Sequence, residues 1–177
     1  MKRIAIDMDE VVADAYNRFF EWYERDFGIK IDPASTYGKK AHLVVAEEHR
    51  DIVKKYPYQP GFFVDLPVME GAVEVIRELQ ARYEIFFVSA AMQFKHSLFE
   101  KSEWLDKYFP FIGWQYRVLC GYKYIIDADY LIDDHTFNLK TFKGQGILFT
   151  SPHNVHENGY PRVNNWAEVK AYFDPLD

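Results

Sequence analysis

The chain has 177 residues, with 27 acidic against 21 basic side chains, a formal net charge of −6, and 49% hydrophobic residues. This length and composition predict one compact domain with at most a small insertion, and exclude a disordered or fibrous chain. The negative charge disfavours nucleic acid polymers as partners, because it repels polyanions. The single cysteine, Cys120, excludes an internal disulfide, and no apolar run reaches the about 20 residues of a spanning helix. We expect a soluble, cytoplasmic protein without a membrane partner.

The first third of the chain predicts a short strand followed by a helical region. Residues 4–6 are β-prone and run into acidic side chains, which is typical of a buried first strand. Residues 15–27 carry aromatic side chains at near-helical spacing, and Gly28 is suited to the C-cap, so a helix is predicted there. Residues 29–67 are rich in turns around a helix predicted at 42–54. We interpret this region as a small cap.

The remaining two thirds predict alternating strands and helices. Apolar spacing and capping signals predict helices at 70–83 and 95–108, and a final helix that begins at the Asn165–Glu168 capping box and ends near Phe173. Short apolar runs predict strands at 84–88, 115–119, 130–132 and 146–149. Strands that alternate with helices are typical of a parallel sheet. The predicted fold class is therefore α/β.

Three of the predicted strands end in reactive side chains, namely Asp7 with Asp9, Ser89, and Asp133 with Asp134. Ligands of open parallel sheets bind beyond the carboxyl ends of the strands, so these side chains should meet in one crevice. Paired carboxylates suit a hard cation, and a carboxylate can attack phosphorus. A single aspartate at a strand end more often starts a turn. The distant doublet Asp133–Asp134 after a buried apolar strand favours a shared site instead.

These segments resemble the motifs of the haloacid dehalogenase (HAD) superfamily of phosphohydrolases. The motifs are read, in order, at residues 7–14, Ser89, Lys123 and Asp133–Asp134. A closer similarity, to the 5'(3')-deoxyribonucleotidases, runs through residues 61–67, 71–74, 101–109, 129–134, 148–150 and 153–154. It implies an HAD-like Rossmannoid core at 1–15 and 67–177, with a small, mainly helical cap at 16–66 inserted after the first strand.

The resemblance also implies roles for individual residues. Asp7 would be the nucleophile, and Asp9 would protonate the leaving oxygen and later activate water. Mg²⁺ would be bound by Asp7, the backbone carbonyl of Asp9, and Asp133, with Asp134 in support. The phosphate group would be held by Ser89, Lys101 and Lys123. The reaction expected is magnesium-dependent hydrolysis of a nucleoside monophosphate, through an aspartyl-phosphate, by a phosphoric monoester hydrolase.

The expected substrate pocket contains aromatic side chains in or near the cap, which are Tyr16, Phe19, Tyr37, Phe62 and Phe63. They can stack on a base, although core packing is the alternative role. The chain departs from the resembling family at Glu10, where the family has glycine, at Ala15, where it has an aromatic residue, and at Ala90–Ala91, where it often has Ser-Pro. These changes affect substrate fit more than the chemical step.

Several alternatives stay open at this point. The chain can be an HAD phosphatase for another small phosphate ester, a phosphomutase, or a non-catalytic domain that binds nucleotides or metal ions. His153 and His156 have a His-x-x-His spacing, but they lie in a loop without a nearby cysteine, so we expect hydrogen bonding there rather than zinc. A homodimer remains an open assembly state.

Overall fold

The computed structural model describes residues 1–176 and contains a six-stranded, fully parallel sheet. The strand order is β3-β2-β1-β4-β5-β6. The strands are β1 (Arg3–Ile6), β2 (Glu84–Ser89), β3 (Arg117–Leu119), β4 (Tyr130–Asp133), β5 (Gln145–Phe149) and β6 (Arg162–Val163). The α/β prediction and the predicted strands are confirmed, except that the strand predicted at 115–119 begins only at Arg117, after a 3₁₀ turn at Trp114–Tyr116. The two-residue β6 was not predicted, because so short a strand carries no readable alternation.

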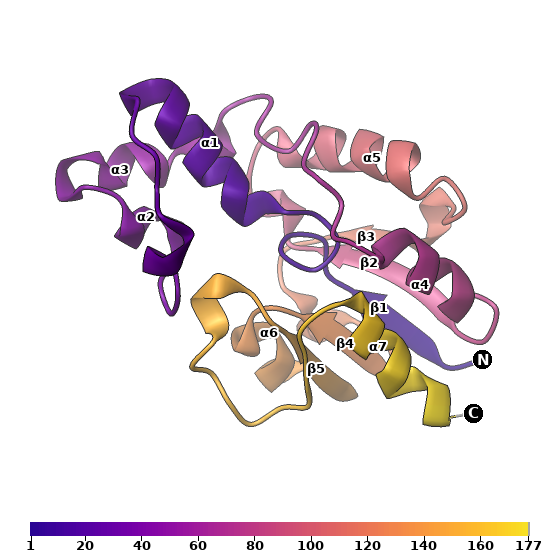
Figure 1. Cartoon of the computed structure of the whole chain (residues 1–177). Coiled ribbons are helices and arrows are strands. Elements are labelled where there is room, and N and C mark those ends of the chain that lie inside the picture. Colours follow the sequence, from indigo (N-terminus) through magenta and orange to yellow (C-terminus); the bar gives the residue numbers. More distant parts are fainter. Residues whose placement is uncertain (177) are drawn as a thin grey trace.

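Helices cover both faces of the sheet (Figure 1). They are α1 (Ala15–Phe27), α2 (Ala41–Val44), α3 (Arg50–Val53), α4 (Ala72–Leu79), α5 (Ser97–Tyr108), α6 (Thr136–Thr141) and α7 (Trp166–Phe173). Because side chains alternate along a strand, Ile4 and Ile6 of β1 join a large buried cluster with residues of α4, α5 and α7. Ala5 points the other way, into a smaller cluster with Leu139 of α6. The short helix α6 was not predicted.

The helix predicted at 15–27 is confirmed with its caps. Gly28 adopts a left-handed conformation, with φ of 68°, and its N–H donates to the Glu24 carbonyl at 2.8 Å. At the other end, the Asp14 side chain accepts from the Asn17 N–H. The carboxylate of Asp14 thus joins the end of the first motif to the start of α1.

The single helix predicted at 42–54 is wrong. The segment forms two short α-helices, α2 and α3, separated by extended backbone at Val45 and a 3₁₀ turn at Glu47–His49. Val44 and Val45 are β-branched and favour helix weakly, and the extended backbone lets the Val45 side chain be buried in the main core. The helix predicted at 70–83 is also shorter, because Gly71 has a positive φ of 78° just before α4 begins.

The segment between β1 and β2 carries α1, α2 and α3, which lie together at one side of the molecule, away from α4 (Figure 1). Arg18 of α1 is joined to the chain that follows α3, since its guanidinium is 2.7 Å from the Asp65 carboxylate. A division into a core at 1–15 and 67–177 and a cap at 16–66 remains our proposal. Among residues 1–176, no helix has the length and apolar character needed to cross a membrane.

Candidate active site

A cavity of about 520 Å³ lies at the carboxyl edge of the sheet. The neighbouring strands β2, β1 and β4 end at this edge, which brings Ser89, Asp7 and Asp133 together from distant parts of the sequence. Side chains of the sheet region that line the cavity include Asp7, Asp9, Glu10, Ser89, Lys123, Asp134, His135, Asn138 and His153. Residues from the first helical region line the rest, among them Tyr16, Phe19, Lys40, His42, Lys54 and Tyr58.

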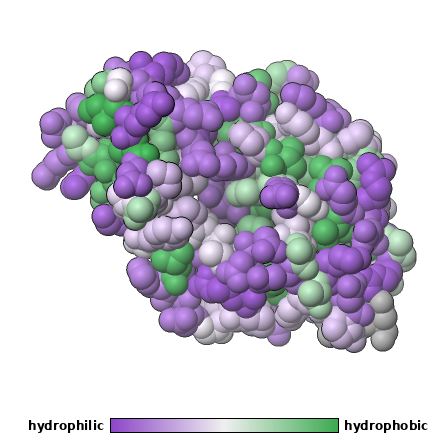
Figure 2. Space-filling view, in the orientation of Figure 1, coloured by the Kyte–Doolittle hydropathy of each residue, from purple (hydrophilic) through white to green (hydrophobic). Residues whose placement is uncertain are grey.

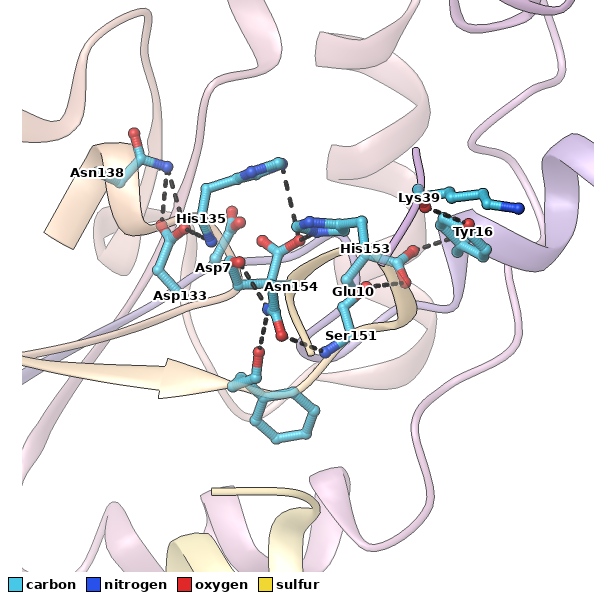
Figure 3. Close-up of polar contacts among 12 residues, drawn as sticks. Asp7, Glu10, Tyr16, Lys39, Asp133, His135, Asn138, Ser151, His153 and Asn154 are labelled. Carbon is cyan, nitrogen blue, oxygen red and sulfur yellow. Dashed lines mark hydrogen bonds and ion pairs between the residues drawn. The ribbon is translucent and has the colours of Figure 1, made fainter. Parts of the chain in front are cut away.

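Lys123 lies between two of the aspartates. Its ammonium nitrogen is 2.6 Å from Asp7 Oδ1 and 2.6 Å from Asp133 Oδ2, and all three side chains are buried. Burial lowers the pKa of Lys123, but the two carboxylates raise it overall above its usual value. Asp133 Oδ1 also accepts hydrogen bonds from the His135 N–H at 2.9 Å and the Asn138 side chain at 3.0 Å (Figure 3). Hydrogen bonds to both carboxylate oxygens therefore fix the position of Asp133.

The buried carboxylates of Asp7, Asp133 and Asp134 have oxygens within 4.8 Å of one another. Burial raises the pKa of Asp7 well above its usual value; Lys123 opposes this, while Asp133 and Asp134 reinforce it. One ammonium group does not balance three carboxylates in a partly dry site. Oxygen ligands in such a cluster fit a hard divalent cation such as Mg²⁺, which would supply the missing positive charge.

Asp9 lies on the same side as Asp7 and also has a buried lysine as its partner. Lys101 Nζ is 2.5 Å from Asp9 Oδ2 and 2.8 Å from Ser89 Oγ. The other Asp9 oxygen, Oδ1, is buried and has no hydrogen-bond partner among the described residues. Met8, between the two aspartates, is buried in the core. Lys101 thus orients Asp9 and Ser89 from behind, since its own side chain does not line the cavity.

Glu10 replaces the glycine of the resembling family at a position with a positive φ of 62°. Its buried carboxyl accepts a hydrogen bond from the Tyr16 N–H and another, at 3.2 Å, from the Ser151 hydroxyl (Figure 3). Burial, followed by the charges of Asp134 and Asp14, raises the pKa of Glu10 well above its usual value. These bonds join the first motif to α1 and to the loop after β5.

Asp134 contacts two imidazoles that the sequence motifs did not bring together. His153 Nε2 is 2.6 Å from Asp134 Oδ2, and the half-exposed His135 stacks on the His153 ring. No sequence pattern indicated a role for His135 or Asn138. Both follow the Asp133–Asp134 doublet within five residues, so extension of the fourth motif past the strand end is the signal that would have found them.

Four of the five predicted pocket aromatics line the cavity, and these are Tyr16, Phe19, Phe62 and Phe63. Tyr37 does not, because its side chain is 64% exposed on the turn that leads to Gly38. Phe19 and Phe62 meet edge to face at 4.9 Å, and the Tyr16 hydroxyl donates to the Lys39 carbonyl at 2.6 Å. Burial and the Glu10 charge raise the pKa of Tyr16 to about 12. The cavity thus has an aromatic wall as well as an acidic floor.

Hydrophilic side chains cover most of the face seen in Figure 2, and hydrophobic ones gather at its upper left, in the region of α1–α3. Exposed apolar side chains of this part of the chain include Ile29, Leu43 and Ile52. Lys40 and Lys54 add positive charge where the same region lines the cavity. The cavity therefore lies between a polar, acidic side and a side of mixed apolar and basic character.

A protein-family comparison matches residues 1–173 to the family described as "5' nucleotidase, deoxy (Pyrimidine), cytosolic type C protein". A putative 5'(3')-deoxyribonucleotidase of Staphylococcus epidermidis is 43% identical over 176 residues, which are 99% of this chain and 98% of that protein. The 5'(3')-deoxyribonucleotidase of Bacillus subtilis is 40% identical over 172 residues, which are 96% of each chain. The similarity extends over nearly the whole chain.

Solved structures share the fold at much lower sequence identity. An HAD family hydrolase of Deinococcus radiodurans, solved with bound phosphate and sodium, aligns with a TM-score of 0.63 at 15% identity over 99% of this chain and 96% of its own. A predicted phosphatase of Clostridium acetobutylicum aligns with a TM-score of 0.63 at 12% identity over 97% of each chain. The fold is therefore HAD-like.

Proposed function

The chain belongs to the family described as 5' nucleotidase, deoxy (pyrimidine), cytosolic type C protein, and on this basis we propose that it hydrolyses nucleoside monophosphates, deoxy ones among them, to nucleoside and phosphate. The observation that carries the proposal is the buried Asp7 carboxylate, held at 2.6 Å by Lys123 on the floor of a cavity with an aromatic wall. The cavity volume of about 520 Å³ suits a small-molecule ligand.

In the proposed first step, a carboxylate oxygen of Asp7 attacks phosphorus and the bond from phosphorus to the nucleoside oxygen breaks. Asp9 gives a proton to the departing oxygen, for which its unpartnered Oδ1 is available. In the second step, Asp9 takes a proton from water, and the water oxygen attacks the phosphorus of the acyl phosphate. Phosphate leaves, and the Asp7 carboxylate is restored.

Other residues hold charge and position in both steps. Ser89 donates its hydroxyl to a phosphoryl oxygen, and Lys123 balances the Asp7 carboxylate and the transferring group. Lys101 fixes Asp9 and Ser89 through its two short contacts. Asp7, Asp133 and Asp134 would hold Mg²⁺, with the Asp9 backbone carbonyl as a further ligand. The bound ion would neutralise the phosphoryl oxygens.

The aromatic wall supports a nucleoside as the leaving group. Phe19 and Phe62 line the cavity, and stacking of a base on such a ring contributes about 1–3 kcal/mol. Lys40 and Lys54 favour a second candidate, a phosphatase of the same mechanism for another small phosphate ester with an additional anionic group. A cytoplasmic location is proposed from the single cysteine and the family's cytosolic description.

A substrate panel tests the proposal. Purified protein is assayed for phosphate release from dUMP, dTMP, p-nitrophenyl phosphate and sugar phosphates, with Mg²⁺ or with EDTA. We expect the nucleotides to be hydrolysed fastest, and only with Mg²⁺. If they are hydrolysed no faster than the other esters, the nucleotidase proposal fails while the phosphatase proposal stands. Asp7→Asn should abolish phosphate release, and unchanged release would contradict the covalent step.

A further inference from the structure

Three side chains beside the proposed Mg²⁺ ligands form a second group of a different chemical kind. Asp134 directly follows β4, His135 is the next residue, and His153 lies in the 3₁₀ turn Pro152–Asn154 after β5. Because β4 and β5 are neighbours in the sheet, the two loops meet at its carboxyl edge. All three side chains line the cavity, so a small ion can reach them from solvent.

The two imidazole rings direct the same nitrogen toward one carboxylate oxygen (Figure 3). Nε2 of His153 is 2.6 Å from Asp134 Oδ2, and Nε2 of His135 is 3.7 Å from that oxygen. The rings stack at a centroid distance of 4.5 Å and an angle of 24°. One ligand atom from each of the three residues lies within 4.8 Å of the other two.

These separations are close to those between the ligand atoms of one metal ion. A tetrahedral ion with bond lengths of about 2.0–2.1 Å holds its ligand atoms about 3.3 Å apart. The 2.6 Å and 3.7 Å distances lie on either side of this value, and the two imidazole nitrogens lie within 4.8 Å of each other. Because the stacked rings are nearly parallel, binding of one ion by both nitrogens requires the half-exposed His135 ring to turn out of the stack. The 3.7 Å separation between His135 Nε2 and Asp134 Oδ2 is too long for a hydrogen bond, and His135 contacts the group through its stacking on the His153 ring.

The loops that carry the group are fixed to each other. The Asn154 side-chain amide donates to the Asp134 carbonyl at 2.7 Å and to the Phe149 carbonyl at 2.8 Å. Such bonds behind a ligand set hold the ligands in place before an ion binds. Asp134 is buried, His153 is partly buried, and the half-exposed His135 lies on the open side.

We propose that Asp134, His135 and His153 form a binding site for a borderline transition-metal ion such as Zn²⁺. Two imidazole nitrogens and one carboxylate oxygen select such ions, whereas the oxygen-only group of Asp7, Asp133 and Asp134 selects Mg²⁺. The sequence spacing pointed to His156 as the partner of His153, but the His156 ring lies against Gly38 instead. The pair that the fold assembles is His135 with His153.

The two sites share Asp134, so occupation of one affects the other. A Zn²⁺ ion on the imidazoles would draw the Asp134 carboxylate away from the Mg²⁺ group. Zn²⁺ is therefore expected to inhibit phosphate release in the presence of Mg²⁺, a consequence that rests on the proposed function. The binding site itself does not rest on it, and its test needs no substrate.

The test is calorimetric titration of Zn²⁺ into the full chain with saturating Mg²⁺ and no substrate. We expect one Zn²⁺ per chain, and an affinity lower by about tenfold or more in His135→Ala. His156→Ala and His42→Ala are matched controls. The first removes the histidine that has the His-x-x-His spacing with His153, and the second removes another imidazole of the cavity wall. Both variants should bind Zn²⁺ like the parent.

A measurement on the unmodified chain guards against a folding defect in the variant. Zn²⁺ should shift the imidazole nitrogen resonances of His135 and His153 and leave those of His42 and His96 in place. The proposal is overturned if the parent binds no Zn²⁺, if His135→Ala binds it equally well, or if other histidine resonances respond instead. In those cases His153 only orients Asp134 by a hydrogen bond.

Discussion

Replacement of Lys123 by methionine tests the charge balance of the site. Methionine keeps most of the length of the side chain and removes the ammonium group that lies 2.6 Å from both Asp7 and Asp133. The side chain is 2% exposed, so water does not replace the lost charge. The change leaves Asp7, Asp133 and Asp134 close together with no buried cation between Asp7 and Asp133.

Loss of one partner from a buried ion pair costs about 3–5 kcal/mol of unfolding free energy. We expect the lower end, about 3 kcal/mol, because a carboxyl group whose pKa is already raised, as that of Asp7 is, can take up a proton. Mg²⁺ should reduce the loss, since a ligand of the folded state at about 100 times its Kd adds about 2.7 kcal/mol. The variant should gain more from Mg²⁺ than the parent, because the ammonium no longer repels the ion.

The assay is urea unfolding of parent and Lys123→Met, each in EDTA and in saturating Mg²⁺. Lys143→Met is the control, because it makes the same change at an exposed position and should alter stability by no more than about 0.5 kcal/mol. The reasoning is refuted if Lys123→Met in EDTA loses no more stability than this control, or if Mg²⁺ stabilises parent and variant equally. Phosphate release by Lys123→Met should fall by about 10²-fold or more.

Three further predictions concern residues around the cavity. Ser89→Ala should lower kcat/KM for phosphate release by about 10²-fold, whereas Ser89→Thr, which keeps the hydroxyl donor, should retain most of it. The pKa of Glu10 is raised in the folded state, so its stabilising contribution is present below the usual glutamate pKa and is lost as pH rises through the raised value. In urea unfolding, Glu10→Gln should therefore gain stability over the parent between about pH 5 and about pH 8. A loss of stability relative to the parent would contradict this prediction. Glu100→Ala removes the acceptor of the Gly61 and Phe63 N–H groups, which lie at 2.7 Å and 3.0 Å. In urea unfolding, it should lower the free energy of unfolding by about 1–3 kcal/mol per buried donor, and Glu100→Gln should lower it less.

Local patterns in the sequence predicted the structure correctly where the backbone conformation depends on neighbouring residues. The strand that precedes Asp7 and the helix α1 with its Gly28 cap follow from apolar spacing and backbone preference. Local patterns failed where burial against distant residues decides the backbone conformation. Val45 leaves the helical conformation to reach the main core, and no pattern within 42–54 reveals that core.

The acidic residues of the cavity were predictable because they stand at or just after the ends of strands, and parallel strands end at one edge. By itself the sequence determined the α/β class, the parallel sheet and the acidic residues at its carboxyl edge. Only the tertiary structure decided which side chains pair across the site, such as Lys101 with Asp9 and His135 with His153, and that Tyr37 faces away from the cavity. The physical reason is that periodicity and turn chemistry act over a few residues, whereas contacts between loops depend on strand order and packing.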